Sequence, residues 1–261
     1  DVLRQRPDFH RFDYLGTYFI RFNTTRKPFD DVRVRQALTL AIDKKRLVEK
    51  FAKAGEKVAD TFVPPVLPNY QSPPGLEPNS ELARRLLAEA GFPGGKNFPR
   101  FDYLYNTGKT HEQIAVELQE MWRRELGLRV ELRQQEMKVY FQAQTRLEYD
   151  TCRSSWIGDY GDANTFLDLF MSNNGNNRTG WKNPRYDALL REANSLTDVR
   201  RREQLLQQAE AMLIREEVPI VPIYFYAGLE YYDAQRIEGV YKNARSEHPL
   251  RVIRKNQPAV E

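Results

Sequence analysis

The chain has 261 residues, 41% hydrophobic and 29% charged, a composition typical of a folded globular protein and too apolar for a disordered one. Its longest nearly uncharged apolar stretch, residues 218–229, is shorter than the roughly 20 residues that a membrane-spanning helix needs. The 40 basic and 36 acidic residues leave a net charge of +4, and because the two signs are interspersed we predict no nucleic-acid partner.

The first third of the chain predicts a strand followed by two helices. Residues 15–24 are rich in aromatic and β-branched residues and indicate a strand. Asp30 or Asp31 is expected to cap a helix, and Asp43 to cap a shorter helix that ends at Gly55.

The middle of the chain alternates helices with strands. Ser80 and Thr110 are expected to begin two helices that end at Gly91 and Gly127. The expected order is a proline-rich surface loop at 64–78, a helix at 80–91, a strand at 101–105, a helix at 110–127, a strand at 128–134, a helix at 138–146 and a strand at 149–156.

The last third predicts a turn, a short helix and a polar loop before the pattern resumes. Two helices are expected at 186–195 and 199–216, and a buried strand at 218–227. Because strands alternate with helices, the sequence predicts an α/β fold with a mixed sheet.

Cysteine and histidine are too scarce to build a metal centre. The single cysteine, Cys152, excludes an internal disulfide and falls on a predicted buried strand, where an inert thiol is the common case. The three histidines, His10, His111 and His248, share no metal-ligand spacing. We therefore predict no metal site and no cofactor.

Two local patterns resemble a phosphate-binding loop and a catalytic carboxylate pair, but neither is sufficient to predict such a site. Gly108-Lys109-Thr110 stands between a predicted strand and a predicted helix. A phosphate-binding loop also needs a glycine five positions before its Gly-Lys pair, and that position here is Tyr103. Asp159, Asp162 and Asp168 cluster after a predicted strand, as the carboxylates of a glycosidase would. Spacing alone does not establish such a pair, and aspartates are more common as turn residues.

The segment SSWIGDYGDANTFLDLF, residues 154–170, resembles the peptide-binding lobe of bacterial extracytoplasmic oligopeptide and dipeptide receptors. These receptors are the family 5 solute-binding components of ABC importers. Further segments resemble the same family in the same order: FNTTRKPFDDVRVRQALTLAIDKKRLV, ARRLLAEAGF, LYNTGKTHEQIA, NNRTGWKNPRYDALL and AEAMLIREEVPIVPIYFY. The resemblance extends over residues 14–254.

The resemblance implies one lobe of a two-lobed receptor. It predicts a periplasmic-binding-protein-like lobe with a mixed sheet flanked by helices, together with hinge strands and a C-terminal tail that packs on another lobe. The expected divisions are 1–22 (end of the first lobe and first hinge strand), 23–224 (ligand-binding lobe) and 225–261 (return through the hinge, and tail). Family members are about twice as long, so we expect the chain to be the C-terminal portion of a longer periplasmic or otherwise extracytoplasmic protein, with any membrane anchor elsewhere.

The resemblance also implies the ligand contacts. Short peptides would add like a strand to the backbone of Ser155, Trp156 and Ile157, with Trp156 as an apolar wall. Asp159 would pair with the peptide's α-amino group. Arg153 and His111 would meet its terminal carboxylate, depending on peptide length.

Departures from the family pattern leave the ligand class open. Ser155 replaces a usual Gly or Ala, and Ala163 replaces a common proline. Receptors for nickel chelates and haem share this scaffold, so a non-peptide solute stays an alternative to peptides, as does a ligand-sensing regulator that uses this lobe. A hydrolase that uses Asp159 with Asp162 or Asp168 is a weaker alternative. The expected protein partner is the membrane permease of the importer.

Overall fold

The computed structural model describes residues 2–256. Residue 1 and residues 257–261, which the sequence analysis assigns to the end of the first lobe and to the tail, lie outside the described part.

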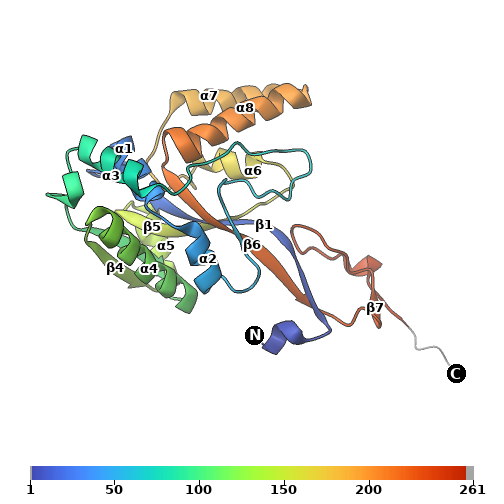
Figure 1. The fold of residues 1–261 in the computed structure, drawn as a ribbon. Helices are drawn as coiled ribbons and strands as arrows, with labels where there is room; N and C mark the ends of the chain where they lie inside the picture. Colours follow the sequence, from blue (N-terminus) through green and yellow to red (C-terminus); the bar gives the residue numbers. More distant parts are fainter. Residues whose placement is uncertain (1, 257–261) are drawn as a thin grey trace.

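A six-stranded mixed sheet of order β2-β6-β1-β5-β3-β4 forms the centre of the molecule (Figure 1). Its strands are β1 Phe9–Phe22, β2 Lys57–Val58, β3 Phe101–Asn106, β4 Val130–Gln135, β5 Thr151–Ile157 and β6 Ile220–Tyr231. β3 is parallel to β4 and β5, whereas β1 is antiparallel to β5 and β6. A separate two-stranded sheet joins β7 Ile237–Glu238 and β8 Arg254–Lys255. The predicted α/β fold with a mixed sheet is confirmed.

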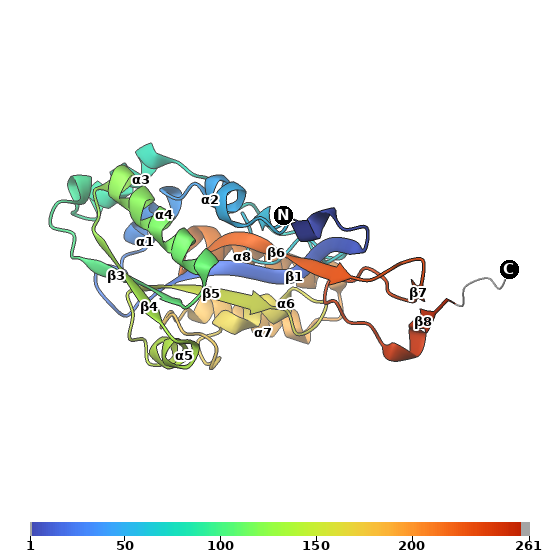
Figure 2. The same cartoon turned by 90° about the horizontal axis from the view of Figure 1, so that it is seen from below.

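Helices cover both faces of this sheet (Figures 1 and 2). They are α1 Val32–Leu40, α2 Lys44–Phe51, α3 Ser80–Glu89, α4 Lys109–Leu126, α5 Met137–Thr145, α6 Asn164–Leu167, α7 Pro184–Ser195 and α8 Val199–Ala211, which continues as a π-helical turn over Met212–Glu216. Successive side chains of a strand point to opposite faces, so β1 contributes to two cores. Tyr18 and Ile20 pack with α1 to α4, while Leu15 and Phe19 pack with α6 to α8.

Most of the predicted helix ends are confirmed. The side chains of Asp31 and Asp43 accept backbone N–H groups at the starts of α1 and α2. Gly91 and Gly127, with φ of 96° and 71°, follow α3 and α4 in the left-handed conformation that glycine adopts without strain.

Two of the predicted ends are wrong. Thr110 is not a cap, because α4 already begins at Lys109 and Gly108 occupies the cap position without a side-chain hydrogen bond. The second helix ends at Phe51 rather than Gly55, since Ala52 has left the helical conformation with ψ of 78°.

β1 and β6 extend beyond the helices toward β7 (Figures 1 and 2). β1 begins six residues before the predicted residue 15, because Phe9 to Asp13 pair with Ala227 to Tyr231 of β6. The segment after β6 returns to the sheet, where the carbonyl of Ala244 accepts the N–H of Leu15 at 2.6 Å. The role of β1 and β6 as hinge strands stays a prediction.

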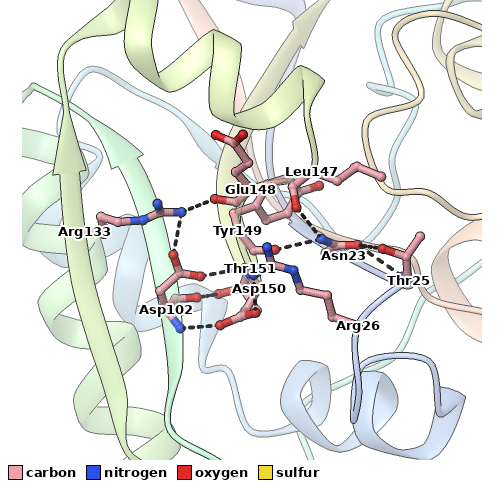
Figure 3. A network of polar contacts seen from close by, with 10 residues as sticks. All are labelled: Asn23, Thr25, Arg26, Asp102, Arg133, Leu147, Glu148, Tyr149, Asp150 and Thr151. Carbon is pink, nitrogen blue, oxygen red and sulfur yellow. Dashed lines mark hydrogen bonds and ion pairs between the residues drawn. The ribbon is translucent and has the colours of Figure 1, made fainter.

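A network of polar contacts fixes the start of β5 (Figure 3). The carboxylate of Asp150 accepts the N–H of Asp102 at 3.0 Å, and that of Asp102 accepts the N–H of Asp150 at 2.6 Å. Arg133 pairs with Asp102 at 2.6 Å and Arg26 with Asp150 at 2.9 Å, so each carboxylate has a cation. The network joins β3, β4 and the segment after β1 to the strand that carries most of the predicted ligand contacts.

Replacing Asn23 in this network should destabilise the chain. Its buried Nδ2 donates to the carbonyls of Leu147 and Tyr149, at 2.9 and 2.8 Å, and its Oδ1 accepts from Thr25. Asn23→Ala leaves these groups without partners and should lower the free energy of unfolding by about 2 kcal/mol. Urea unfolding followed by circular dichroism measures the loss, and the exposed Asn194→Ala should stay within about 0.5 kcal/mol of wild type. Equal stability of the two variants would contradict this assignment.

Candidate functional site

The second half of β5 has one free edge. β1 pairs with β5 along its whole length, from Phe22 opposite Thr151 to Gly16 opposite Ile157. β3 pairs with β5 only at Thr151 and Cys152. In the described part of the chain, no strand lies beside β5 on that side beyond Cys152. This opening is the edge at which the resemblance to peptide receptors predicts the ligand.

Hydrogen-bond alternation decides which backbone groups face the free edge. The N–H of Gly158 donates to Leu15 of β1 at 2.8 Å, whereas the carbonyl of Arg153 faces away from β1 and accepts from Gln144 at 3.0 Å. Because N–H and C=O of one residue point to the same side in an antiparallel ladder, Ser155 and Ile157 present both groups to the free edge. Trp156 directs its main chain to β1 and can contribute only its side chain.

Trp156 is partly a core residue. Its half-buried indole packs against the core formed with α6 to α8, and Nε1 donates to the carbonyl of Thr165 at 2.7 Å. The ring is therefore held in one orientation, with part of its surface left in solvent. Packing in the core is thus compatible with the apolar wall that the resemblance implies, which stays a prediction.

A buried guanidinium lies at one end of the free edge. Arg153 is 8% exposed, donates to Asn106 at 2.9 Å and Ser155 at 3.1 Å, and lies 5.1 Å from the ring centre of Tyr18. Its Nε has no partner, and among residues 2–256 no carboxylate forms an ion pair with it. A buried charge without a counter-ion is costly, so this position favours an incoming anion.

His111 adjoins the same cluster from α4. Its ring centre is 5.7 Å from that of Tyr18, and its buried Nδ1 has no hydrogen-bond partner. Burial, and then the charge of Arg153, lower the pKa of His111 to about 4. The imidazole is thus neutral at pH 7 and can offer a ligand a hydrogen bond but no charge. The structure brings Arg153 and His111 together, as their shared predicted role requires.

Carboxylates lie at the other end of the edge. Asp159 is exposed, its N–H donates to Oγ1 of Thr165 at 3.0 Å, and among the described residues no cation forms an ion pair with it. Burial, and then the charge of Asp159, raise the pKa of Asp168. This end has negative charge without a protein counter-ion and so favours an ammonium group.

Asp162 differs from its two neighbours. Its carboxylate accepts both terminal nitrogens of Arg202, at 2.8 and 2.9 Å, and also the N–H of Asn164 at 2.8 Å. Burial opposes ionisation, but these hydrogen bonds leave the pKa of Asp162 below its usual value. Asp162 is engaged in structure, which removes it from the pair of acids that a hydrolase would need.

Three residues of the site were missed from sequence: Tyr18, Asn106 and Thr165. Only Asn106 gave a local signal, as a polar residue at the carboxyl end of a parallel strand, where α/β folds place their ligands. Tyr18 and Thr165 look like ordinary strand and helix residues.

Two wider properties of the described residues also bear on the site. Residues 2–256 contain no cluster of three or more His, Cys, Asp or Glu side chains placed to hold a metal ion. Over the same residues, no helix combines the length and apolar character needed to cross a membrane.

Comparison with known proteins places the chain in a family. The family model described as bacterial extracellular solute-binding proteins, family 5, middle, matches residues 2–178. The oligopeptide-binding protein OppA of Bacillus subtilis is 34% identical over 247 residues, covering 92% of this chain. The murein peptide-binding protein MppA of Escherichia coli is 37% identical over 81% of the chain, and a haem-binding protein A of Haemophilus influenzae is 32% identical over 82%.

Solved structures match the fold to a similar extent. A periplasmic oligopeptide-binding protein of Borrelia burgdorferi superposes with a TM-score of 0.87 at 30% identity, over 98% of this chain and 51% of its own. The chain spans about half the length of the relatives it matches, with 45% of the B. subtilis protein and 40% of the E. coli protein covered. The chain belongs to family 5 of the bacterial extracellular solute-binding proteins.

Proposed function

We propose that the chain forms one wall of a peptide-binding cleft in the substrate-binding component of an ABC importer. The observation that carries the proposal is the free edge of β5, with a carboxylate at one end and a buried guanidinium at the other, neither of which forms an ion pair within residues 2–256. A free peptide in extended conformation matches this arrangement, since it has an ammonium at one end and a carboxylate at the other.

The contacts proposed for such a peptide are independent of its side chains. The backbone groups of Ser155 and Ile157 pair with the peptide main chain, as in strand addition to a sheet edge. Asp159 accepts the α-ammonium, Arg153 meets the carboxylate with a neutral hydrogen bond from His111, and Trp156 supplies an apolar wall. Recognition of this kind admits many sequences.

The length of the edge indicates short peptides. Asp159 lies six positions after Arg153, which would correspond to about 20 Å if the chain stayed extended, and less because β5 ends at Ile157. The guanidinium shortens this distance, because it leans toward Ser155 and donates to its Oγ at 3.1 Å. A ligand of a few residues fits between the two charged groups.

The proposed setting follows from the same site and from the relatives. A protein that captures free peptides for import acts outside the cytoplasmic membrane, and it docks on the permease subunits of its transporter. The proposed role is binding without catalysis and without a cofactor. It is supported by the pairing of Asp162 with Arg202, which leaves the half-buried Asp168 as the other free acid of this cluster in the described part of the chain.

A non-peptide solute is the second candidate, and the haem-binding relative favours it. Haem carries two carboxylates but no ammonium, so it would use Arg153 and leave Asp159 without a partner. The two candidate ligands therefore differ in whether they contact Asp159.

Thermal unfolding of the full-length protein that contains this chain tests the proposal. The full-length protein is needed because one wall cannot fully remove a peptide's charged ends from water. A mixed library of di- to pentapeptides should raise the melting temperature, because a ligand that binds only the folded state stabilises it. Haemin and a nickel chelate serve as comparison ligands. Stabilisation by haemin or the chelate alone would refute peptide binding.

A further inference from the structure

A buried threonine holds two residues of the candidate site at once. Oγ1 of Thr165 accepts the N–H of Asp159 at 3.0 Å, and its carbonyl accepts the indole N–H of Trp156 at 2.7 Å. Thr165 is 2% exposed, so it does not touch a ligand itself. Its contacts join α6 to the turn that presents Asp159 and to the wall formed by Trp156.

α6 has only four residues and needs support from outside, because so short a helix is not stable alone. Asp162 supplies part of it by accepting the N–H of Asn164 at 2.8 Å. Arg202 of α8 then holds Asp162 with two hydrogen bonds of 2.8 and 2.9 Å, a bidentate geometry that fixes both side chains. A continuous set of contacts therefore runs from α8 through Asp162 and α6 to Asp159.

The turn over residues 158–161 is tightly packed at its first residue and open to solvent at its last. A side chain at Gly158 would come within 2.7 Å of Leu15 and 3.1 Å of Phe166, so the backbone there is tightly packed. At Gly161 the same construction meets nothing within 4 Å. Between these two glycines, the hydrogen bond to Thr165 is the side-chain contact that fixes the backbone of Asp159.

We propose that Thr165 is a positioning residue for recognition of the ligand's ammonium group, and that the Arg202–Asp162 pair keeps Thr165 in place. The proposal rests on the proposed function, since it concerns the same site. The hydroxyl fixes the backbone of Asp159, and with it the direction in which the side chain leaves the turn toward the ligand. Serine can take the same role, whereas valine has the same shape but cannot accept the N–H.

Binding of one tripeptide in free-amine and N-acetylated forms to the full-length protein tests this assignment. Thr165→Val should raise the Kd of the free-amine peptide about tenfold and that of the acetylated peptide less than about twofold. Thr165→Ser should keep both values within about twofold of wild type. A role in stability alone predicts equal losses for the two peptides, and that result would overturn the proposal, as would unchanged binding by Thr165→Val.

A second variant tests the support from α8. Arg202→Lys keeps the charge but loses the bidentate contact, so it should weaken free-amine binding in the same direction by about threefold. Combined with Thr165→Val it should add no further loss, because both changes act through one set of contacts. Additive losses would show that Arg202 does not act through Thr165, and would overturn that part of the proposal. If the wild-type protein binds the two peptides equally well, the amine role of Asp159 fails first, and the positioning role fails with it.

Discussion

Asp159→Asn in the full-length protein should weaken binding of free-amine peptides about 100-fold, equivalent to about 3 kcal/mol. The change keeps the size and hydrogen-bonding oxygen of the side chain but removes the charge that faces the ammonium. The loss is large because no cation among the described residues pairs with Asp159, so this carboxylate is free for the ligand. Isothermal titration calorimetry with one tripeptide measures the change in Kd.

The acetylated form of the same peptide separates charge recognition from general damage to the cleft. It lacks the ammonium, so Asp159→Asn should change its Kd less than about threefold. Asp30→Asn, at an exposed carboxylate before α1, should leave the Kd of both peptides unchanged. Equal losses for free and acetylated peptides would rule out the amine contact, even if peptides do bind.

The fold could be predicted largely from local patterns. Alternating strands and helices predicted the mixed sheet, and the capping aspartates Asp31 and Asp43 predicted the starts of two helices. Cys152 is fully buried, and burial raises the pKa of its thiol to about 11, in agreement with an inert residue. These features depend on neighbours within a few residues in sequence, or on burial alone.

The candidate site could be predicted only in part, because its members come together from distant segments. Asp159 and Asp162 are three residues apart and look equivalent in sequence. The structure separates them through Arg202, which lies 40 residues later and engages only Asp162. The resemblance to peptide receptors singled out Asp159, whereas the reason that Asp162 is engaged required the packing of α8.

Thr110 is a case in which local sequence predicted the wrong role: we expected it to cap a helix. Threonine is a good helix cap, and it stands at the start of α4. The helix nevertheless begins at Lys109, so Thr110 is already inside the first turn. Local propensity located the helix but not its first residue.

Glu210→Ala should cause the largest loss of stability among the changes considered, about 3–5 kcal/mol. Glu210 is fully buried on α8, and its carboxylate accepts the N–H groups of Phe62 and Val63, each at 2.9 Å, and the hydroxyl of Tyr70 at 2.7 Å. Alanine leaves these three donors buried without partners and opens a cavity between α8 and the proline-rich loop. Guanidinium unfolding of the chain measures the loss.

Glu203→Ala, two turns earlier on α8, is the matched control. Its carboxylate accepts two longer hydrogen bonds, from the N–H of Gln71 at 3.3 Å and from Nε2 of Gln207 at 3.2 Å, and lies nearer solvent. We expect a loss below about 1 kcal/mol. Similar losses for Glu203→Ala and Glu210→Ala would show that the buried contacts of Glu210 are not a major source of stability.

The pH dependence of Glu210→Gln gives an independent check. Burial raises the pKa of Glu210 in the folded chain, despite the hydrogen bonds that favour ionisation. The folded state therefore holds this proton more tightly than the unfolded chain, in which the pKa of glutamic acid is about 4.3. The resulting stabilisation is fully present below the unfolded pKa and is lost as pH rises through the folded value. Glutamine does not titrate, so the stability of wild type relative to Glu210→Gln should increase as pH falls from 7 toward 4. A difference that stays constant over this range would show that the folded and unfolded chains hold the proton equally.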